Sequence, residues 1–334
     1  MNQRIHAAAS AGACMALAMS IVGCGKSDAP APGTHANTAT TASSSRDQGA
    51  SAEAVAKQAR GKLSCPAKIA SRSRADSAPV DDVLGVRPGL TYEEAMNAVL
   101  CTHELLVATP PFNRGFNLKA ADARSVRQGF SATFAEPHVV KSSKQIMEEL
   151  QLDAIARGGN SVREDLKPGQ AKWFVGTMGL PGQERVLSVA REERFAPDQS
   201  PTLDTVFAAL LKKYGTPTRE QRGTSGQLPI VRWAYDPQGA LITATSPLYN
   251  RCTGASDPNG GVNLTPDCGI VVQAMLVPQK SNPALVERMQ VGVVDQAVGY
   301  QMIIATEQSL GQADQQRRAN EVEKATKNAK APTL

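Results

Sequence analysis

Aromatic and histidine residues are scarce in this 334-residue chain: Phe, Trp and Tyr together make up 4% of it, and there are four histidines. A surface that binds nucleic acid normally gathers basic residues on one face or interleaves them with stacking aromatics. Here Lys and Arg are scattered among Asp and Glu, and the net charge is only +5. A mixed solvated surface explains this charge, so we expect no nucleic-acid partner.

The sequence also lacks the short motifs of common catalytic sites. It contains no Gly-x-Ser-x-Gly, Ser-x-x-Lys, His-Glu-x-x-His or Walker loop. The segment Gly223-Thr224-Ser225-Gly226 is better explained as a polar loop, and the neighbours Glu192 and Glu193 point to opposite faces of a predicted strand. We expect no catalytic residue. An envelope hydrolase remains an alternative, because a triad is defined in space and not by chain order.

Metal-binding spacings are missing as well. There is no Cys-x-x-Cys, and downstream of residue 60 the only histidines are His103 and His138. Neither is spaced from another ligand as in a zinc site, so we predict surface or packing roles for both. We expect neither a metal nor a cofactor.

Long apolar runs are absent except near the N-terminus. Arg4 precedes the apolar stretch from Ala7 to Val22. This stretch is shorter than the roughly 20 residues that a membrane-spanning helix requires, and its layout is typical of a secretory signal peptide. We predict a signal peptide over residues 1–23.

The junction Ile21-Val22-Gly23-Cys24 resembles the lipobox of bacterial lipoproteins, in which the cysteine is acylated and becomes the mature N-terminus. The residues before Cys14 lack the branched apolar residue of this pattern. The resemblance implies palmitate and other acyl chains on Cys24. It also implies a periplasm-facing place in the cell envelope, with the membrane as a partner through the lipid anchor.

The residues after Cys24 bear on the choice of membrane. Gly25 stands where lipoproteins retained in the inner membrane of enteric bacteria carry Asp, which favours the outer membrane. Lys26 and Ser27, in contrast, resemble the corresponding pair in inner-membrane lipoproteins of pseudomonads. We expect the outer membrane.

Residues 24–60 have the composition of a flexible tether. Ala, Thr, Ser, Pro and Gly dominate from Ser27 to about Arg60, and large apolar residues are almost absent. Such a segment cannot bury enough surface to offset the entropy of ordering. We predict a lipidated, disordered tether with a root-mean-square reach of about 30 Å.

Two sets of helix and strands follow in the hydrophobic pattern. The first module, residues 61–200, is expected to contain a helix that starts at Thr91 with a Thr-x-x-Glu capping box to Glu94, and then Gln128–Ala135 (strand), Ser142–Arg157 (helix), Ala171–Met178 and Arg185–Phe195 (a hairpin). The second module, residues 201–310, is expected to contain Thr202–Tyr214 (helix), Ile230–Tyr235, Ala240–Thr245, Gly269–Val277 and Gln290–Val294 (strands).

A C-terminal helix is predicted from Asp295 to about Lys327, apolar at first and wholly polar beyond Leu310. Residues 311–334 are expected to be a polar, partly disordered tail. The fold class is therefore α+β, with tandem helix-plus-antiparallel-meander modules and a C-terminal helix.

Four cysteines follow the tether, and export to an oxidising compartment makes disulfides the default. Three pairings are open. Cys252 and Cys268 bracket one Gly-rich loop, and closing it is worth about 3 kcal/mol in the chain-entropy model. Cys65 and Cys101 then pair by elimination.

Two surfaces are candidates for binding: the loop between Cys252 and Cys268, and the group Arg232, Trp233 and Asp236 near a predicted turn. Structural roles compete with the second candidate. A Trp on a strand is usually core, and an Asp before Pro-x-Gly usually shapes the turn.

Two short segments resemble a known family: Leu84-Gly85-Val86-Arg87-Pro88-Gly89-Leu90-Thr91-Tyr92-Glu93-Glu94-Ala95 and Leu210-Leu211-Lys212-Lys213-Tyr214-Gly215-Thr216-Pro217. They are similar to a helix opening and a helix exit in the SmpA/BamE outer-membrane lipoproteins, whose fold is shared with β-lactamase inhibitor proteins. The resemblance covers about a tenth of the chain and implies a helix-plus-sheet fold, without transferring function.

The expected function is a non-enzymatic, lipid-anchored binding or scaffold module of the cell envelope with an envelope protein as partner. This expectation rests on the predicted tether, the predicted disulfides and the absence of catalytic motifs from the sequence. The alternatives are the envelope hydrolase named above and an inhibitor of a secreted enzyme.

Overall fold

The computed structural model describes residues 50–71, 75, 77–110, 126–139, 141–156, 166–223, 227–254, 256–257 and 262–330. These residues belong to the compact unit that extends from Asp47 to Leu334. The predicted signal peptide, the lipidation site Cys24, most of the predicted tether, Thr224 to Gly226 and residues 331–334 lie outside the described residues.

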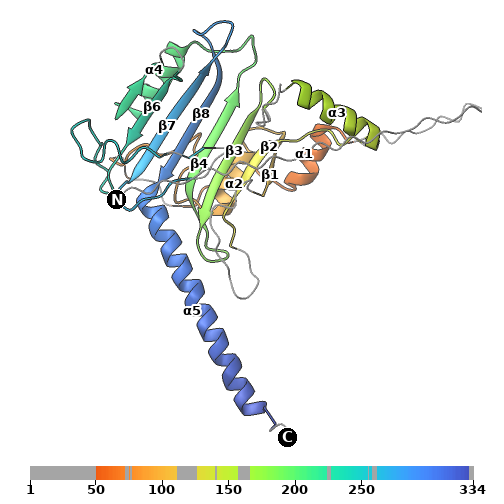
Figure 1. Ribbon diagram of the computed structural model, residues 1–334, viewed down its shortest axis with the longest axis vertical. Helices are drawn as coiled ribbons and strands as arrows, with labels where there is room; N and C mark the ends of the chain where they lie inside the picture. Colours follow the sequence, from red (N-terminus) through yellow and green to blue (C-terminus); the bar gives the residue numbers. More distant parts are fainter. Residues whose placement is uncertain are drawn as a thin grey trace, which may run out of the picture. The chain divides into compact units, whose positions relative to one another are not determined.

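Eight antiparallel strands of the described chain form one sheet in the order β1-β2-β3-β4-β8-β7-β6-β5 (Figure 1). The strands are β1 (Leu106–Thr109), β2 (Gly129–Phe134), β3 (Ala171–Met178), β4 (Arg185–Arg194), β5 (Arg219–Gln221), β6 (Ile230–Ala234), β7 (Ile270–Pro278) and β8 (Val286–Asp295). The helices are α1 (Ala52–Arg60), α2 (Tyr92–Leu100), α3 (Ser143–Ala156), α4 (Leu203–Tyr214) and α5 (Gln296–Asn328).

The sheet consists of two modules with the same construction. Module 1 is α2 followed by β1 to β4, and module 2 is α4 followed by β5 to β8. In each module the cap residue of the helix pairs with the chain at the start of the last strand, Thr91 with Arg185 and Thr202 with Leu285. The last hairpin of each module also carries one register shift, at 176/177 and at 277/278.

The modules join where β4 pairs with β8, antiparallel, from Ser188–Val294 to Arg194–Arg288. We call this junction the seam. The strand order and the antiparallel pairing relate the modules by an approximate twofold axis through the seam. The expected α+β class with tandem helix-plus-meander modules and a C-terminal helix is therefore confirmed.

Local sequence signals account for the starts of the helices. Thr91 accepts the N–H of Glu94, and the Glu94 carboxylate accepts the N–H of Thr91, which is the predicted capping box. Thr202 caps α4 and Asp295 caps α5 through the same kind of side-chain acceptor.

One face of the sheet carries the main core. Alternate strand residues such as Trp173, Val189 and Trp233 point to this face and pack with apolar residues of α2 and α4. Large side chains in this cluster, including both tryptophans, are fully buried. We call the opposite side, which neither α2 nor α4 covers, the polar face.

Part of the polar face is covered by a long loop between β6 and β7. Cys252, Cys268 and Ile242 from this region pack on Ala234, Val271 and Val294 of the sheet, together with Leu248, Tyr249, Val262 and Leu264. A Cβ atom at Gly292 would lie 2.0 Å from the carbonyl oxygen of Ser256, so the loop backbone rests directly on β8 and only glycine fits there.

The predicted strand from Ala240 to Thr245 is wrong. Only Leu241 bridges to Tyr235, after which the chain turns to form the covering loop. Ile242 packs in the loop's apolar cluster and so satisfies its hydrophobicity without strand pairing. The edge strands β1 and β5, of four and three residues, were not predicted.

The last part of the predicted tether is helical. Ser51 caps α1, Ala56 is only 1% exposed, and Arg60 donates to the carbonyl oxygens of Leu100 and His103. The alanine-rich sequence favours a helix once one side docks, and α1 docks beside β1. The expectation of disorder up to residue 60 is therefore wrong for residues 52–60.

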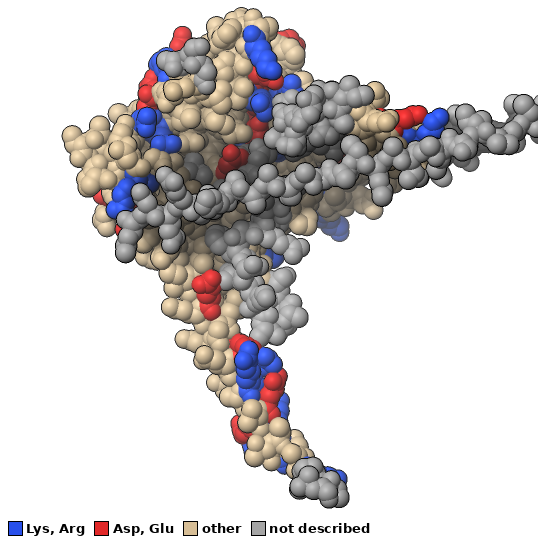
Figure 2. Space-filling model, in the orientation of Figure 1, with Lys and Arg blue, Asp and Glu red and all other residues tan. Residues whose placement is uncertain are grey.

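Helix α5 has nearly the predicted bounds, Asp295 to about Lys327. Its first turns pack Met302, Ile303 and Leu310 against Leu187 and Met178. It then continues as an exposed helix to Asn328, which agrees with the predicted end near Lys327. In Figure 2 the far part of α5 carries mixed basic and acidic side chains, and ion pairs one turn apart support this exposed stretch.

Candidate functional site

A charged cluster lies at the seam on the polar face. The Glu192 carboxylate is 3.2 Å from the Lys172 ammonium and 3.4 Å from the Arg288 guanidinium. Glu192 belongs to module 1 and Arg288 to module 2, so this ion pair links the modules. The Glu192 side chain is only 3% exposed, too little to contact a substrate, which points to a structural role.

Glu193 does not join this cluster. It pairs with Arg191 at 2.6 Å on the helix-covered face. The two neighbouring glutamates thus point to opposite sides of the sheet, as predicted from strand alternation.

One of the three residues predicted from the sequence to form a binding surface, Arg232, lies on the polar face in the row of side chains next to that of Glu192. Arg232 donates from Nε and Nη2 to Oε1 of Gln273, at 3.1 and 2.6 Å. Desolvation lowers the pKa of the Arg232 guanidinium, and the charge of Arg219 on the neighbouring strand lowers it further. Both partners are half-buried, so their polar edges border solvent.

The other two residues of that group have structural roles. Trp233 is fully buried on the opposite face, where its Nε1 donates to the Gly215 carbonyl oxygen at 2.9 Å and its ring packs on Tyr214. Asp236 accepts the backbone N–H groups of Gln238 and Ala240, which shapes the turn. The structural interpretation is confirmed for both, and Arg232 alone lies on a candidate binding face.

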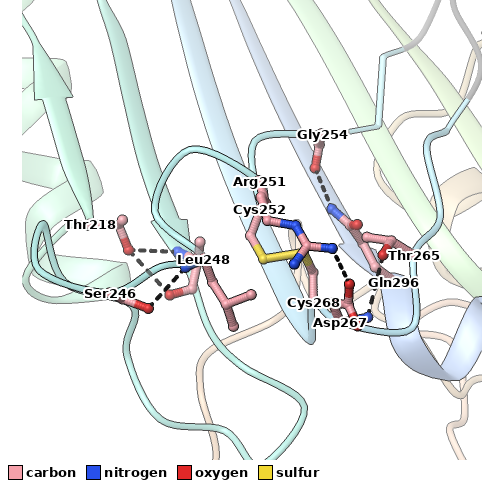
Figure 3. The surroundings of a disulfide bond; sticks show 11 residues. Thr218, Ser246, Leu248, Arg251, Cys252, Gly254, Thr265, Asp267, Cys268 and Gln296 are labelled. Carbon is pink, nitrogen blue, oxygen red and sulfur yellow. Dashed lines mark hydrogen bonds and ion pairs between the residues drawn. A yellow bond between two sulfur atoms is a disulfide. The ribbon is translucent and has the colours of Figure 1, made fainter.

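The loop closed by Cys252 and Cys268 is held firmly on the polar face (Figure 3). Beside the disulfide, Arg251 forms an ion pair with Asp267. Gln296 at the start of α5 donates to the Gly254 carbonyl oxygen at 3.0 Å. The loop therefore acts as a fixed third layer that leaves the rest of the polar face uncovered by it.

Both predicted disulfides form. Cys252 and Cys268 lie 16 residues apart in the chain, and Cys65 and Cys101 lie 36 residues apart. The second bond joins the segment after α1 to the end of α2. Each module thus contains one disulfide.

The two histidines lie at the surface, as predicted. The ring of His103 contacts that of Phe134 at 4.4 Å, and its Nδ1 accepts the N–H of Leu105. His138 is exposed. Within the described ranges, no group of three or more His, Cys, Asp and Glu side chains is arranged to hold a metal ion.

Sequence reasoning missed a buried ion pair at the turn between β3 and β4. Arg127 donates from Nε and Nη2 to the carboxylate of Glu184, which is 1% exposed, and its guanidinium lies 4.1 Å from the centre of the Tyr92 ring. Burial raises the pKa of Glu184, but the hydrogen bonds from Arg127 outweigh it and the net pKa is lowered. Arg127 and Glu184 are 57 residues apart in the chain, so no local sequence motif predicts this pair.

Comparison with known proteins yields no relative: no protein-family description, no curated protein and no solved structure matches this chain. Of the helices in the described part of the chain, none combines the length and the apolar character needed to cross a bilayer.

Proposed function

We propose that this chain is a lipid-anchored binding or scaffold module of the bacterial cell envelope, facing the periplasm and attached through acyl chains on Cys24. One observation carries the proposal: both modules of the body contain a disulfide. Disulfides persist in oxidising compartments, and the apolar stretch before Cys24 supplies the route of export. Gly25 makes the outer membrane the preferred site.

The proposed contact surface is the part of the polar face that the loop between Cys252 and Cys268 does not cover. Its half-buried side chains come from both modules and include Lys172, Gln290, Gln273 and Arg232. Polar side chains already held by neighbours lose little entropy when a partner binds, which favours a protein partner over a small substrate. We also propose that the two segments that resemble the SmpA/BamE lipoproteins reflect a similar helix-plus-sheet fold, without transfer of function.

The anchor is tested by replacing Cys24 with alanine. We expect the parent protein to take up radioactive palmitate and to sediment with membranes, and the Cys24→Ala protein to lose both properties. A Cys14→Ala protein is the matched control, since Cys14 lacks the lipobox residues and should behave as the parent. Equal palmitate labelling of parent and Cys24→Ala would overturn the proposal.

The binding face is tested by photocrosslinking in intact cells. A photoreactive residue at Gln290, on the seam, should capture one specific envelope protein. The same residue at Lys212, on the exposed side of α4, should not. A one-to-one complex with a secreted enzyme would identify an inhibitor. Repeated failure to capture any protein at Gln290 would argue against the proposed face.

A further inference from the structure

Helix α3 forms where it was predicted, but its apolar side is not buried. Ile146, Met147 and Leu150 are 46%, 62% and 51% exposed. At 100° per residue these three side chains lie within about 100° of one another around the helix axis. Globular proteins normally bury such a cluster of apolar side chains, so we expect this side of α3 to contact a partner or a membrane.

Four charged side chains of α3 and of the turn before it lie outside that apolar side and are paired with one another. Lys141 contacts Glu149 at 2.6 Å, and Lys144 lies 3.8 Å from Glu148. Two lysines are thus matched by two glutamates. The occupant is therefore selected by apolar burial and not by attraction of opposite charge.

The occupant is indicated by the position of α3, which lies close to the point where the N-terminal segment joins the body. The backbone N–H of His138, five residues before α3, donates to the carbonyl oxygen of Ala50, which directly precedes the cap of α1. Figure 1 shows α1 and α3 at the same end of the sheet. The segment leading to Cys24 therefore joins the body next to α3.

Cys24 and Ala50 are 26 positions apart in the chain (50 minus 24). If this segment is the flexible tether that its composition predicts, its root-mean-square end-to-end distance is about 28 Å. A body tethered in this way would reach the bilayer surface often, and α3 lies close to the point where the tether is attached. The apolar face of α3 is too small to bind a free protein to a bilayer. In a tethered protein it can bind, because the tether raises the effective concentration of this face at the bilayer surface.

We infer that α3 is an interfacial helix that lays Ile146, Met147 and Leu150 onto the phospholipid bilayer that carries the anchor. This inference rests on the proposed function, since the lipid on Cys24 is what attaches the body to the bilayer. The contact orients the body, with module 1 next to the membrane at its β1 edge, and leaves the polar face available to a partner.

The test uses the full lipidated chain in vesicles of phosphatidylethanolamine and phosphatidylglycerol, with a photoreactive residue at Met147. Leu152 is the matched control, because it is 66% exposed on the other side of the same helix. We expect at least fivefold more lipid adduct at Met147 than at Leu152, with little change when the salt concentration is raised to 0.5 M. Equal lipid adducts at the two positions would overturn the inference, as would adducts from Met147 mainly to protein.

A second measurement avoids the photoreactive residue. In the same vesicles, amide hydrogen exchange of α3 should be several-fold slower than in detergent for the parent and for Leu152→Glu, but not for Met147→Glu. Palmitate labelling of the same samples separates the two proposals. Unlabelled parent protein would refute the anchor, whereas labelled, membrane-bound protein whose α3 exchanges equally fast in all three forms would refute only the role of α3.

Discussion

Replacing Glu94 with glutamine tests the hydrogen-bond centre at the start of α2. The Glu94 carboxylate accepts the backbone N–H groups of Thr91, Ala70 and Ser71 at 2.9, 2.6 and 2.7 Å, and the Ser71 hydroxyl as well. It thereby caps α2 and also fastens the preceding segment to it. Burial alone would raise the pKa of Glu94, but the hydrogen bonds from Ser71, Thr91 and Ala70 outweigh it and lower the pKa from 4.5 to about 2.

The pKa shift sets the size of the effect. A fall from 4.5 to about 2 corresponds to roughly 3 kcal/mol of folding free energy. Partial exposure of Glu94 to solvent reduces this to about 2 kcal/mol. The folded pKa lies below the unfolded one, so the contribution is complete above about pH 5 and is lost as the pH falls through 4.5 towards 2.

Urea unfolding of the parent and of Glu94→Gln measures this contribution. We expect the parent to be more stable by about 2 kcal/mol at pH 7, and by about a quarter of that at pH 2.5, where the unfolded carboxyl is protonated. Other carboxylates, Glu184 among them, titrate in both proteins and cancel. Glu148→Gln, at an exposed pair on α3, should change stability by no more than about 0.5 kcal/mol. A stability difference that stays constant from pH 7 to pH 2.5 would refute the reasoning.

Two further substitutions test the packing, each with a matched control. Gly292→Ala should destabilise the protein by about 1–3 kcal/mol in thermal or urea unfolding, because the new methyl group meets the Ser256 carbonyl oxygen. Gly311→Ala, on α5 with nothing within 4 Å, should instead be neutral or stabilise by up to about 1 kcal/mol. Trp233→Phe should cost about 1 kcal/mol more than Trp173→Phe, because the Trp233 indole N–H donates to a backbone carbonyl oxygen whereas that of Trp173 has no partner. Equal costs for the two tryptophans would contradict this account.

Local signals in the sequence were sufficient for most elements. Thr91, Thr202 and Asp295 each accept a backbone N–H three residues later in the chain, so a window of four residues contains the information for a helix start. The hairpin of β3 and β4 was predicted from alternation on either side of a turn. Both disulfides were predicted from the spacing of four cysteines.

The failures involve segments whose conformation depends on distant partners. Residues 240–245 have a strand-like composition, but Ile242 finds its apolar contacts in the loop cluster. Residues 52–60 have the composition of a tether, yet Ala56 is buried once α1 docks. Burial against residues far along the chain overrides local propensity in both cases.

The candidate binding face could not be predicted from the sequence for the same reason. Lys172, Glu192 and Arg288 carry no motif, and Glu192 and Arg288 are 96 residues apart. Of the surface residues proposed from sequence, only Arg232 lies on this face. Trp233 and Asp236 have the structural roles that their residue types made the better interpretation.

The amino-acid sequence alone determined where most helices and strands begin, which cysteine pairing is favoured, and that helix-plus-meander units occur twice, because capping, alternation and loop closure are short-range effects. Only the tertiary structure decided that β4 pairs with β8, and hence which side chains share the seam and which face remains polar. Strand register across nearly a hundred residues depends on the simultaneous packing of both modules, and no local pattern encodes that.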